Sequence, residues 1–136
     1  MSVVKAKPRQ TGATAVLPRL GQPVVTSVTG GEIGVVTRPS EAGFSPLDLL
    51  YASLSACLVL SARIAASTLG VLDRLVEVRA EVKGDKAPEE PGRIERFHVE
   101  IEVVGDFDAA TRAAIIAEAE RICTVSNTLK GSPVLG

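Results

Sequence analysis

The sequence is short of aromatic side chains and of metal-binding residues. It contains no tryptophan, one tyrosine, three phenylalanines and a single histidine, His98. Zinc sites and Cys–His nucleophile pairs depend on histidines, so the composition argues against both. Fifteen basic residues balance sixteen acidic ones without forming a basic patch. Binding to nucleic acid therefore has no electrostatic basis, and we expect neither a metal site nor a nucleic-acid partner.

Targeting signals and long apolar runs are also missing. Residues 1–8 lack the apolar stretch that a signal peptide carries. The most apolar stretch, Leu49–Ile64, is interrupted by serines and Arg63. It is shorter than the roughly 20 apolar residues that a membrane span needs. We therefore expect a cytoplasmic protein with no membrane partner, whose thiols stay reduced unless catalysis oxidises them.

Two isolated cysteines are the most informative feature that the sequence does have. Cys57 follows an apolar stretch rich in small residues, and Cys123 ends a second helical pattern; there is no CxxC motif. Free cysteines are commonly buried, so two inert core thiols are one interpretation, and spacing alone favours it. Two thiols that are each positioned by a helix also fit dithiol redox chemistry.

Hydrophobic patterning predicts one α+β domain spanning residues 1–136. Three β-branched runs separated by glycine turns predict an antiparallel meander over residues 14–17, 23–28 and 32–37. Ser45 is a suitable N-cap for a long helix that begins at Pro46 and ends at Leu69, before Gly70. Two further strands and a second helix, capped by Asp106 or Asp108, complete the domain.

The two later strands alternate between apolar and charged residues. Val76, Val78, Ala80 and Val82 share one face of the first strand, and Phe97, Val99, Ile101 and Val103 share one face of the second. His98 falls on the opposite, polar face, where we expect a solvent-exposed strand residue rather than a catalytic group.

The long helix has apolar residues around its whole circumference, so we expect it to be buried centrally. A domain of this size has little surface with which to enclose it. A second subunit would supply the missing cover, which predicts a homodimer with the helices between the sheets.

The segments around both cysteines resemble the OsmC/Ohr family of osmotically inducible and organic hydroperoxide resistance proteins, most closely its OsmC-like branch. The stretch from Gly43 through Ser45-Pro46-Leu47-Asp48-Leu49 to Cys57 is similar to a family motif with a cysteine at the same distance after the proline. Cys123-Thr124-Val125-Ser126-Asn127 is similar to the family's Cys-Pro-x-Ser stretch, with Thr124 in place of proline. The similarity extends over nearly the whole chain.

The resemblance implies an intertwined homodimer and a thiol peroxidase that reduces organic hydroperoxides. In such an enzyme Cys57 attacks the peroxide, Cys123 resolves it to a disulfide, and a dithiol reductant restores both thiols. No metal, flavin or haem is implied. The residues favour the same assignment, because the partial negative charge at a helix C-terminus disfavours a thiolate at Cys123. The two thiols should then lie close enough to bridge.

Two further catalytic residues follow from the resemblance. A buried thiolate at Cys57 requires stabilisation, and in the family an arginine near the N-terminus provides it. Arg19 is the candidate here, with Arg9 and Arg38 as alternatives. The hydroperoxide resistance branch pairs that arginine with a glutamate where this chain has Leu47. Asp48, one position later, either holds the arginine or only caps the helix.

A second function class is a non-catalytic dimer that binds a small apolar ligand at the subunit interface and keeps its cysteines as structural residues. The state of the thiols after exposure to peroxide discriminates between the two classes.

Overall fold

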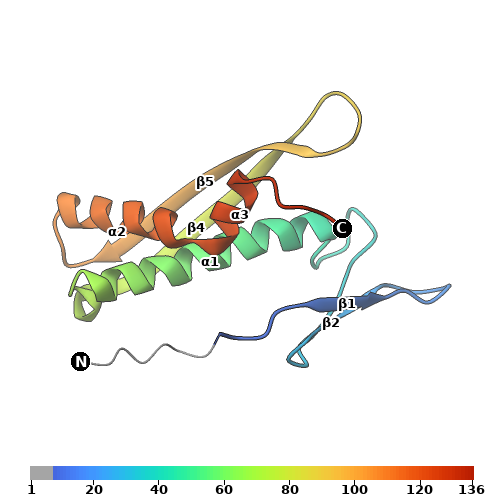
Figure 1. The fold of residues 1–136 in the computed structure, drawn as a ribbon, viewed down its shortest axis with the longest axis horizontal. Coiled ribbons are helices and arrows are strands. Elements are labelled where there is room, and N and C mark those ends of the chain that lie inside the picture. The colour runs from blue at the N-terminus through green and yellow to red at the C-terminus, as the bar shows by residue number, and fades with distance from the viewer. Residues whose placement is uncertain (1–7) are drawn as a thin grey trace. The chain divides into compact units, whose positions relative to one another are not determined.

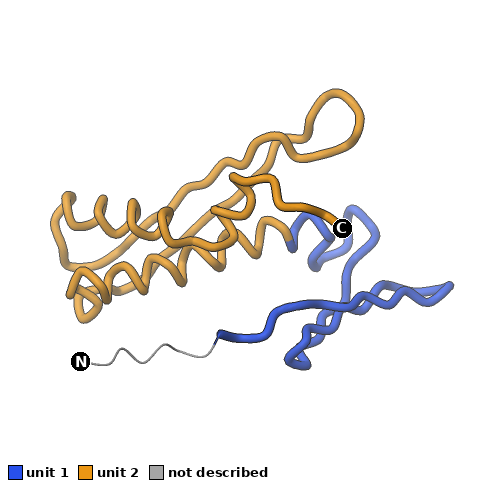
Figure 2. Tube along the Cα trace, viewed as in Figure 1, with its two compact units in different colours: residues 1–49 blue, residues 50–136 orange. Residues whose placement is uncertain are grey.

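The structure is a computed structural model that describes residues 8–136. Residues 1–7, on which the expected lack of a signal peptide rests, lie outside this range. The chain forms two compact units, residues 1–49 and 50–136, each described by itself below (Figure 2). The elements follow one another as three short strands, a long helix, a two-stranded hairpin and two further helices (Figure 1). This order confirms the predicted α+β class.

The first unit contains the predicted meander. Strands β1 (Ala13–Val16), β2 (Val24–Ser27) and β3 (Glu32–Gly34) form an antiparallel sheet in the order β1-β2-β3. Val25 lies at its centre, opposite Ala15 on one side and Ile33 on the other. Most of its side chains are exposed within this unit.

Helix α1 (Pro46–Thr68) begins where the sequence predicts. The Asp48 main-chain N–H donates to Ser45 Oγ over 3.2 Å, and the Ser45 N–H donates to Asp48 Oδ2 over 3.0 Å. This reciprocal pair is a capping box, which supplies partners for main-chain N–H groups at the first turn. Gly70 follows the helix with φ of +76°, a left-handed conformation that suits glycine and ends the helix.

The second unit is built on a long antiparallel hairpin, β4 (Leu75–Lys86) and β5 (Ile94–Gly105). Its inward face differs from the prediction at one end. A register shift between Leu75 and Glu77 places Leu75 against the core and leaves Val76 76% exposed, whereas the alternation predicted Val76 on the apolar face. A bulge of this kind inserts a residue and interrupts the period of two.

Helices α2 (Ala109–Ile122) and α3 (Thr124–Lys130) follow the hairpin, with Asp108 as the N-cap of α2. Residues of α1, α2 and β5 form one cluster around fully buried Ile115. Its buried members are Ala62, Ala65, Ala66, Val103, Ile115 and Ala119. Alanines predominate on the α1 side, so the helices approach closely, as the small residues of this segment predict.

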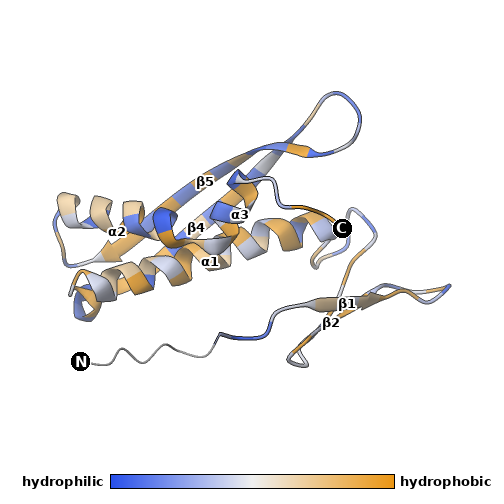
Figure 3. Cartoon of the chain, viewed as in Figure 1, coloured by the Kyte–Doolittle hydropathy of each residue, from blue (hydrophilic) through white to orange (hydrophobic). Residues whose placement is uncertain are grey.

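A single copy buries one stripe of α1. Leu54, Leu58, Ser61, Ala62, Ala65 and Ala66 are buried, while Leu60 and Ile64 are 50% and 56% exposed. Apolar residues predominate along the whole helix (Figure 3).

The length argument against a membrane span does not hold, because the helix has 23 residues and is long and apolar enough to cross a membrane. Its buried stripe packs on β5 and α2, as the stripe of a core helix does.

Candidate active site

Two thiols from distant parts of the chain meet in one packed cluster. Cys57 lies in the middle of α1, and Cys123 occupies the single position between α2 and α3. Both are free cysteines. Cys123 is fully buried with Leu54 and Leu58, and Cys57 packs against the same cluster while remaining partly exposed. The walls are apolar residues of the hairpin and of α3: Ala80, Val82, Phe97, Ile101, Val125 and Leu129.

The surroundings of Cys57 favour its thiolate. Burial of the sulfur is the largest single influence and raises the pKa of Cys57, yet hydrogen bonds from neighbouring donors outweigh it and bring this pKa below its usual value. The groups that lower this pKa are, in decreasing order, the Cys123 thiol, the main-chain N–H of Val125, the Ser61 hydroxyl and the main-chain N–H of Thr124. The net effect is a partly exposed thiol that loses its proton more readily than a free cysteine does.

Cys123 has the opposite tendency. Burial raises its pKa first, and the neighbouring Cys57 sulfur raises it further. The main-chain N–H of Ser126, which donates to Cys123 Sγ over 3.4 Å, offsets only part of this. As the pH rises, the negative charge therefore forms on Cys57 before it forms on Cys123. This asymmetry gives an accessible nucleophile beside a protected thiol.

The two remaining predicted site residues belong to the first unit. Arg19 is exposed in the connection between β1 and β2, and Arg9 and Arg38 are exposed as well. The Arg9 guanidinium donates to Thr29 Oγ1 over 2.5 Å. Asp48 has its carboxylate occupied by Ser45, whose N–H and hydroxyl both donate to Oδ2 over 3.0 Å. These bonds lower the pKa of Asp48.

Three donors to Cys57 were absent from the sequence interpretation. Thr124 and Val125 are distant in sequence, and nothing in their residue types indicates that their main-chain N–H groups face Cys57. Ser61 could have been identified from the sequence, because a residue four positions after Cys57 lies on the same face of the helix. The expectation that Cys57 requires a cation considered only the position of Cys57 on its own helix.

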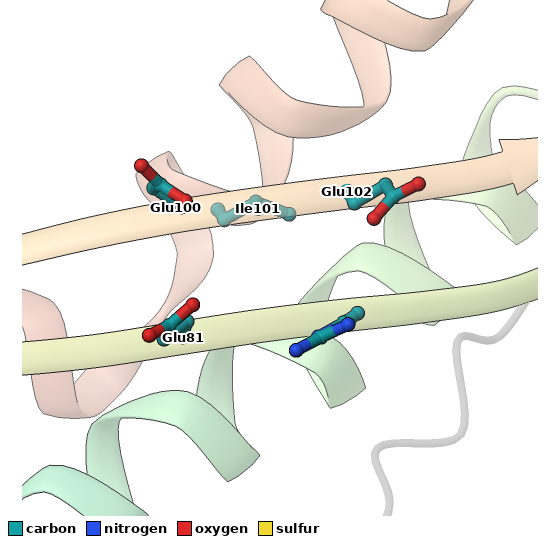
Figure 4. Close-up of a pocket in the computed structure, with 5 residues that line it drawn as sticks. Glu81, Glu100, Ile101 and Glu102 are labelled. Carbon is teal, nitrogen blue, oxygen red and sulfur yellow. The ribbon is translucent and has the colours of Figure 1, made fainter.

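The outward face of the hairpin carries no comparable chemistry. An open depression of about 500 Å³ is lined by Arg79, Glu81, Glu100, Ile101 and Glu102 (Figure 4). His98 lies farther along and contacts Asp85 over 2.7 Å on the exposed surface, as predicted for a solvent-facing residue. Within residues 8–136, no group of three or more His, Cys, Asp or Glu side chains is arranged to hold a metal ion.

The family model for OsmC-like proteins matches residues 39–136, which include both cysteines. The chain belongs to the OsmC-like family. None of the curated proteins compared with this OsmC-like chain matches it.

Solved structures share the OsmC-like fold over most of the chain. An OsmC-like protein from Mycoplasma pneumoniae is 20% identical with a TM-score of 0.77, and the match covers 92% of this chain and 90% of that one. The organic hydroperoxide resistance protein OsmC from Legionella pneumophila is 19% identical, with a TM-score of 0.72 and 93% of each chain covered. The organic hydroperoxide resistance protein OhrB of Bacillus subtilis is 19% identical, with a TM-score of 0.65 and coverage of 91% and 93%. At these identities the likeness shows the fold.

Proposed function

We propose that this protein is a thiol peroxidase that reduces organic hydroperoxides in defence against oxidative stress. One observation carries the proposal: the partly exposed thiol of Cys57 and the buried thiol of Cys123 pack in the same cluster. The surroundings lower the pKa of Cys57 and raise that of Cys123, which supports the same roles. In such a pair, the thiol with the lower pKa attacks the peroxide and the other thiol then forms the disulfide. Family membership supports the proposal, since two structural relatives are organic hydroperoxide resistance proteins.

In the first step the Cys57 thiolate attacks the distal oxygen of the hydroperoxide. An S–O bond forms and the O–O bond breaks, which leaves a sulfenic acid on Cys57 and releases an alkoxide that takes up a proton to become the alcohol. The apolar walls of the cluster suit the organic part of the substrate.

In the second step the Cys123 sulfur attacks the sulfenic sulfur, a disulfide forms and water leaves. Loss of the negative charge on Cys57 removes one of the influences that raise the pKa of Cys123, so the first step prepares the second. A dithiol reductant then exchanges with the disulfide and restores both thiols. This cycle requires no metal, flavin or haem, and we propose that it runs in the cytoplasm.

Brief treatment of the reduced protein with a bulky organic hydroperoxide, followed by mass spectrometry, tests this function. We expect the loss of two hydrogen atoms and a peptide that links Cys57 to Cys123. Two unchanged thiols, under conditions in which iodoacetamide still alkylates Cys57, would contradict the peroxidase.

We also propose that the working form is a homodimer. Leu60 and Ile64 of α1 are half exposed. An open depression of about 240 Å³ is lined by Leu60 and Arg63 of α1 and by the exposed Val76 of β4. A second copy would remove these apolar side chains from water. We expect twice the monomer mass by light scattering at micromolar concentration, and a shift toward the monomer in Ile64→Lys. A monomeric wild-type protein would rule the dimer out.

Arg19 is the proposed cation that assists Cys57, with Asp48 holding it in place. Arg19→Ala should slow peroxide reduction and move the alkylation profile of Cys57 to higher pH, because a nearby positive charge favours the thiolate. Asp48→Asn should do the same more weakly, since the amide can still cap α1. Arg9→Ala and Arg38→Ala test the two alternative arginines by the same measurement. If both Arg19→Ala and Asp48→Asn keep the wild-type profile, the pair has no role in activation.

A further inference from the structure

The hydroxyl groups along α1 differ in their hydrogen-bond partners. Ser53 and Ser55 donate to the carbonyls three residues earlier over 2.7 and 3.1 Å, and Thr68 donates to the carbonyl four residues earlier over 3.1 Å. Ser67 is exposed to water. Ser61 is only 6% exposed, and the hydrogen bonds found among residues 8–136 include none from its hydroxyl, either to a main-chain carbonyl or to a sulfur.

The position of Ser61 directs its hydroxyl toward Cys57. The two residues are four apart on α1 and therefore share a face of the helix. Side chains of a helix lean toward its N-terminus, so the Ser61 hydroxyl leans toward the turn that carries Cys57. Leu58 and Ala65, the neighbours of Ser61 along this stripe, are buried as well.

Packing alone does not call for a hydroxyl at this position. The buried stripe of α1 continues with alanines at positions 62, 65 and 66, and alanine differs from serine only by the oxygen. A buried hydroxyl costs free energy unless it finds a hydrogen-bond partner. The sulfur of Cys57 is the partner that the helix geometry offers. Consistent with this, burial raises the pKa of Cys57 while the Ser61 hydroxyl is among the groups that lower it.

We propose that Ser61 is a positioning residue whose hydroxyl donates a hydrogen bond to the Cys57 thiolate, stabilising its charge and fixing the direction of the sulfur. The consequence of this hydrogen bond for catalysis rests on the proposed peroxidase function. The effect of the hydrogen bond on the pKa of Cys57 is independent of that function, because alkylation measures it without any peroxide.

The test is the rate of iodoacetamide alkylation of Cys57 as a function of pH, followed by peptide mass spectrometry in the reduced protein. Ser61→Ala removes a donor to the thiolate, so the pKa of Cys57 rises and the thiolate fraction at low pH falls. Below the midpoint of the profile we expect about tenfold slower alkylation, the size of effect that one hydrogen bond to a charged acceptor has. Above the midpoint the rates should converge.

Ser55→Ala is the matched control, since Ser55 is a part-buried serine of the same helix whose hydroxyl bonds Ala52. Its profile should equal that of the wild type. Ser61→Thr keeps a hydroxyl and should restore much of the wild-type profile. A purely structural role would lower the melting temperature of Ser61→Ala without moving its profile.

An unshifted profile in folded Ser61→Ala, or an equal shift in Ser55→Ala, would overturn the assignment. If the wild-type protein does not reduce peroxide but the alkylation profile of Ser61→Ala is shifted, the proposed peroxidase function is wrong. The role of Ser61 at the Cys57 thiolate would then still hold. For an active enzyme we expect Ser61→Ala to lose rate at neutral pH and to regain it at alkaline pH.

Discussion

Cys57→Ser should abolish the reduction of organic hydroperoxides, whereas Cys123→Ser should still cleave one equivalent of peroxide. The serine hydroxyl does not ionise near neutral pH, so Cys57→Ser has no nucleophile at this position. In Cys123→Ser the first step remains available, but no second thiol can displace water from the sulfenic acid. Mass spectrometry of Cys123→Ser after peroxide treatment should find one added oxygen atom on the Cys57 peptide.

The two variants can also contradict the assignment of roles. If Cys57→Ser keeps turning over peroxide while Cys123→Ser does not, the later cysteine is the nucleophile. The buried state of Cys123 and its raised pKa speak against that outcome. Thermal melting of both reduced variants controls for folding, since serine is close to cysteine in size.

Ile115→Ala should produce the largest loss of stability. Ile115 is fully buried on α2, where its side chain joins Ala62 of α1 to Val103 of β5. Truncation removes buried apolar atoms and leaves a cavity, and such changes cost about 2–5 kcal/mol. Urea unfolding at a fixed protein concentration measures this, because association contributes to the stability of an oligomer.

Leu135→Ala is the control for that experiment. Leu135 is fully exposed near the C-terminus, so its truncation should change the free energy of unfolding by less than about 0.5 kcal/mol. Equal losses in the two variants would mean that Ile115 does not lie in the core described above.

The order of helices and strands could be predicted because local signals determined it. Ser45 and Asp48 form the capping box that begins α1, and Gly70 ends it. Alternation along the hairpin predicted the inward positions of Phe97, Ile101 and Val103. Each of these signals lies within a few residues of the feature that it determines.

The bulge at Val76 and the burial of α1 depend on contacts that a local pattern does not contain. Apolar and charged residues alternate along β4 with a period of two, and this pattern places Val76 on the inward face. In the structure Leu75 packs against the core instead. Apolar residues surround α1, but one copy of the chain covers only the stripe that faces β5 and α2. The rest of that pattern is the surface that the proposed homodimer would cover.

For the candidate site, the sequence directs attention to two cysteines but says little about what surrounds them in space. Cys57 and Cys123 were identified from their flanking motifs, and they pack in the same cluster. The chemistry of Cys57 was assessed from α1 alone, which suggested a need for a distant cation. The main-chain groups that begin α3 reach Cys57 only through the tertiary fold, and their effect on its pKa does not depend on residue type at Val125.

The scarcity of aromatic residues provides an optical probe of the same region. Without tryptophan, Tyr51 is the chain's one strong fluorophore in the near ultraviolet. Its ring meets Phe97 edge to face with centroids 6.1 Å apart, and Phe97 packs against the cluster that holds both thiols. Gly84 leaves room for the ring, because a Cβ atom there would lie 2.5 Å from the tyrosine hydroxyl oxygen. Tyrosine emission is therefore a label-free probe placed one side chain away from the cluster that holds both thiols.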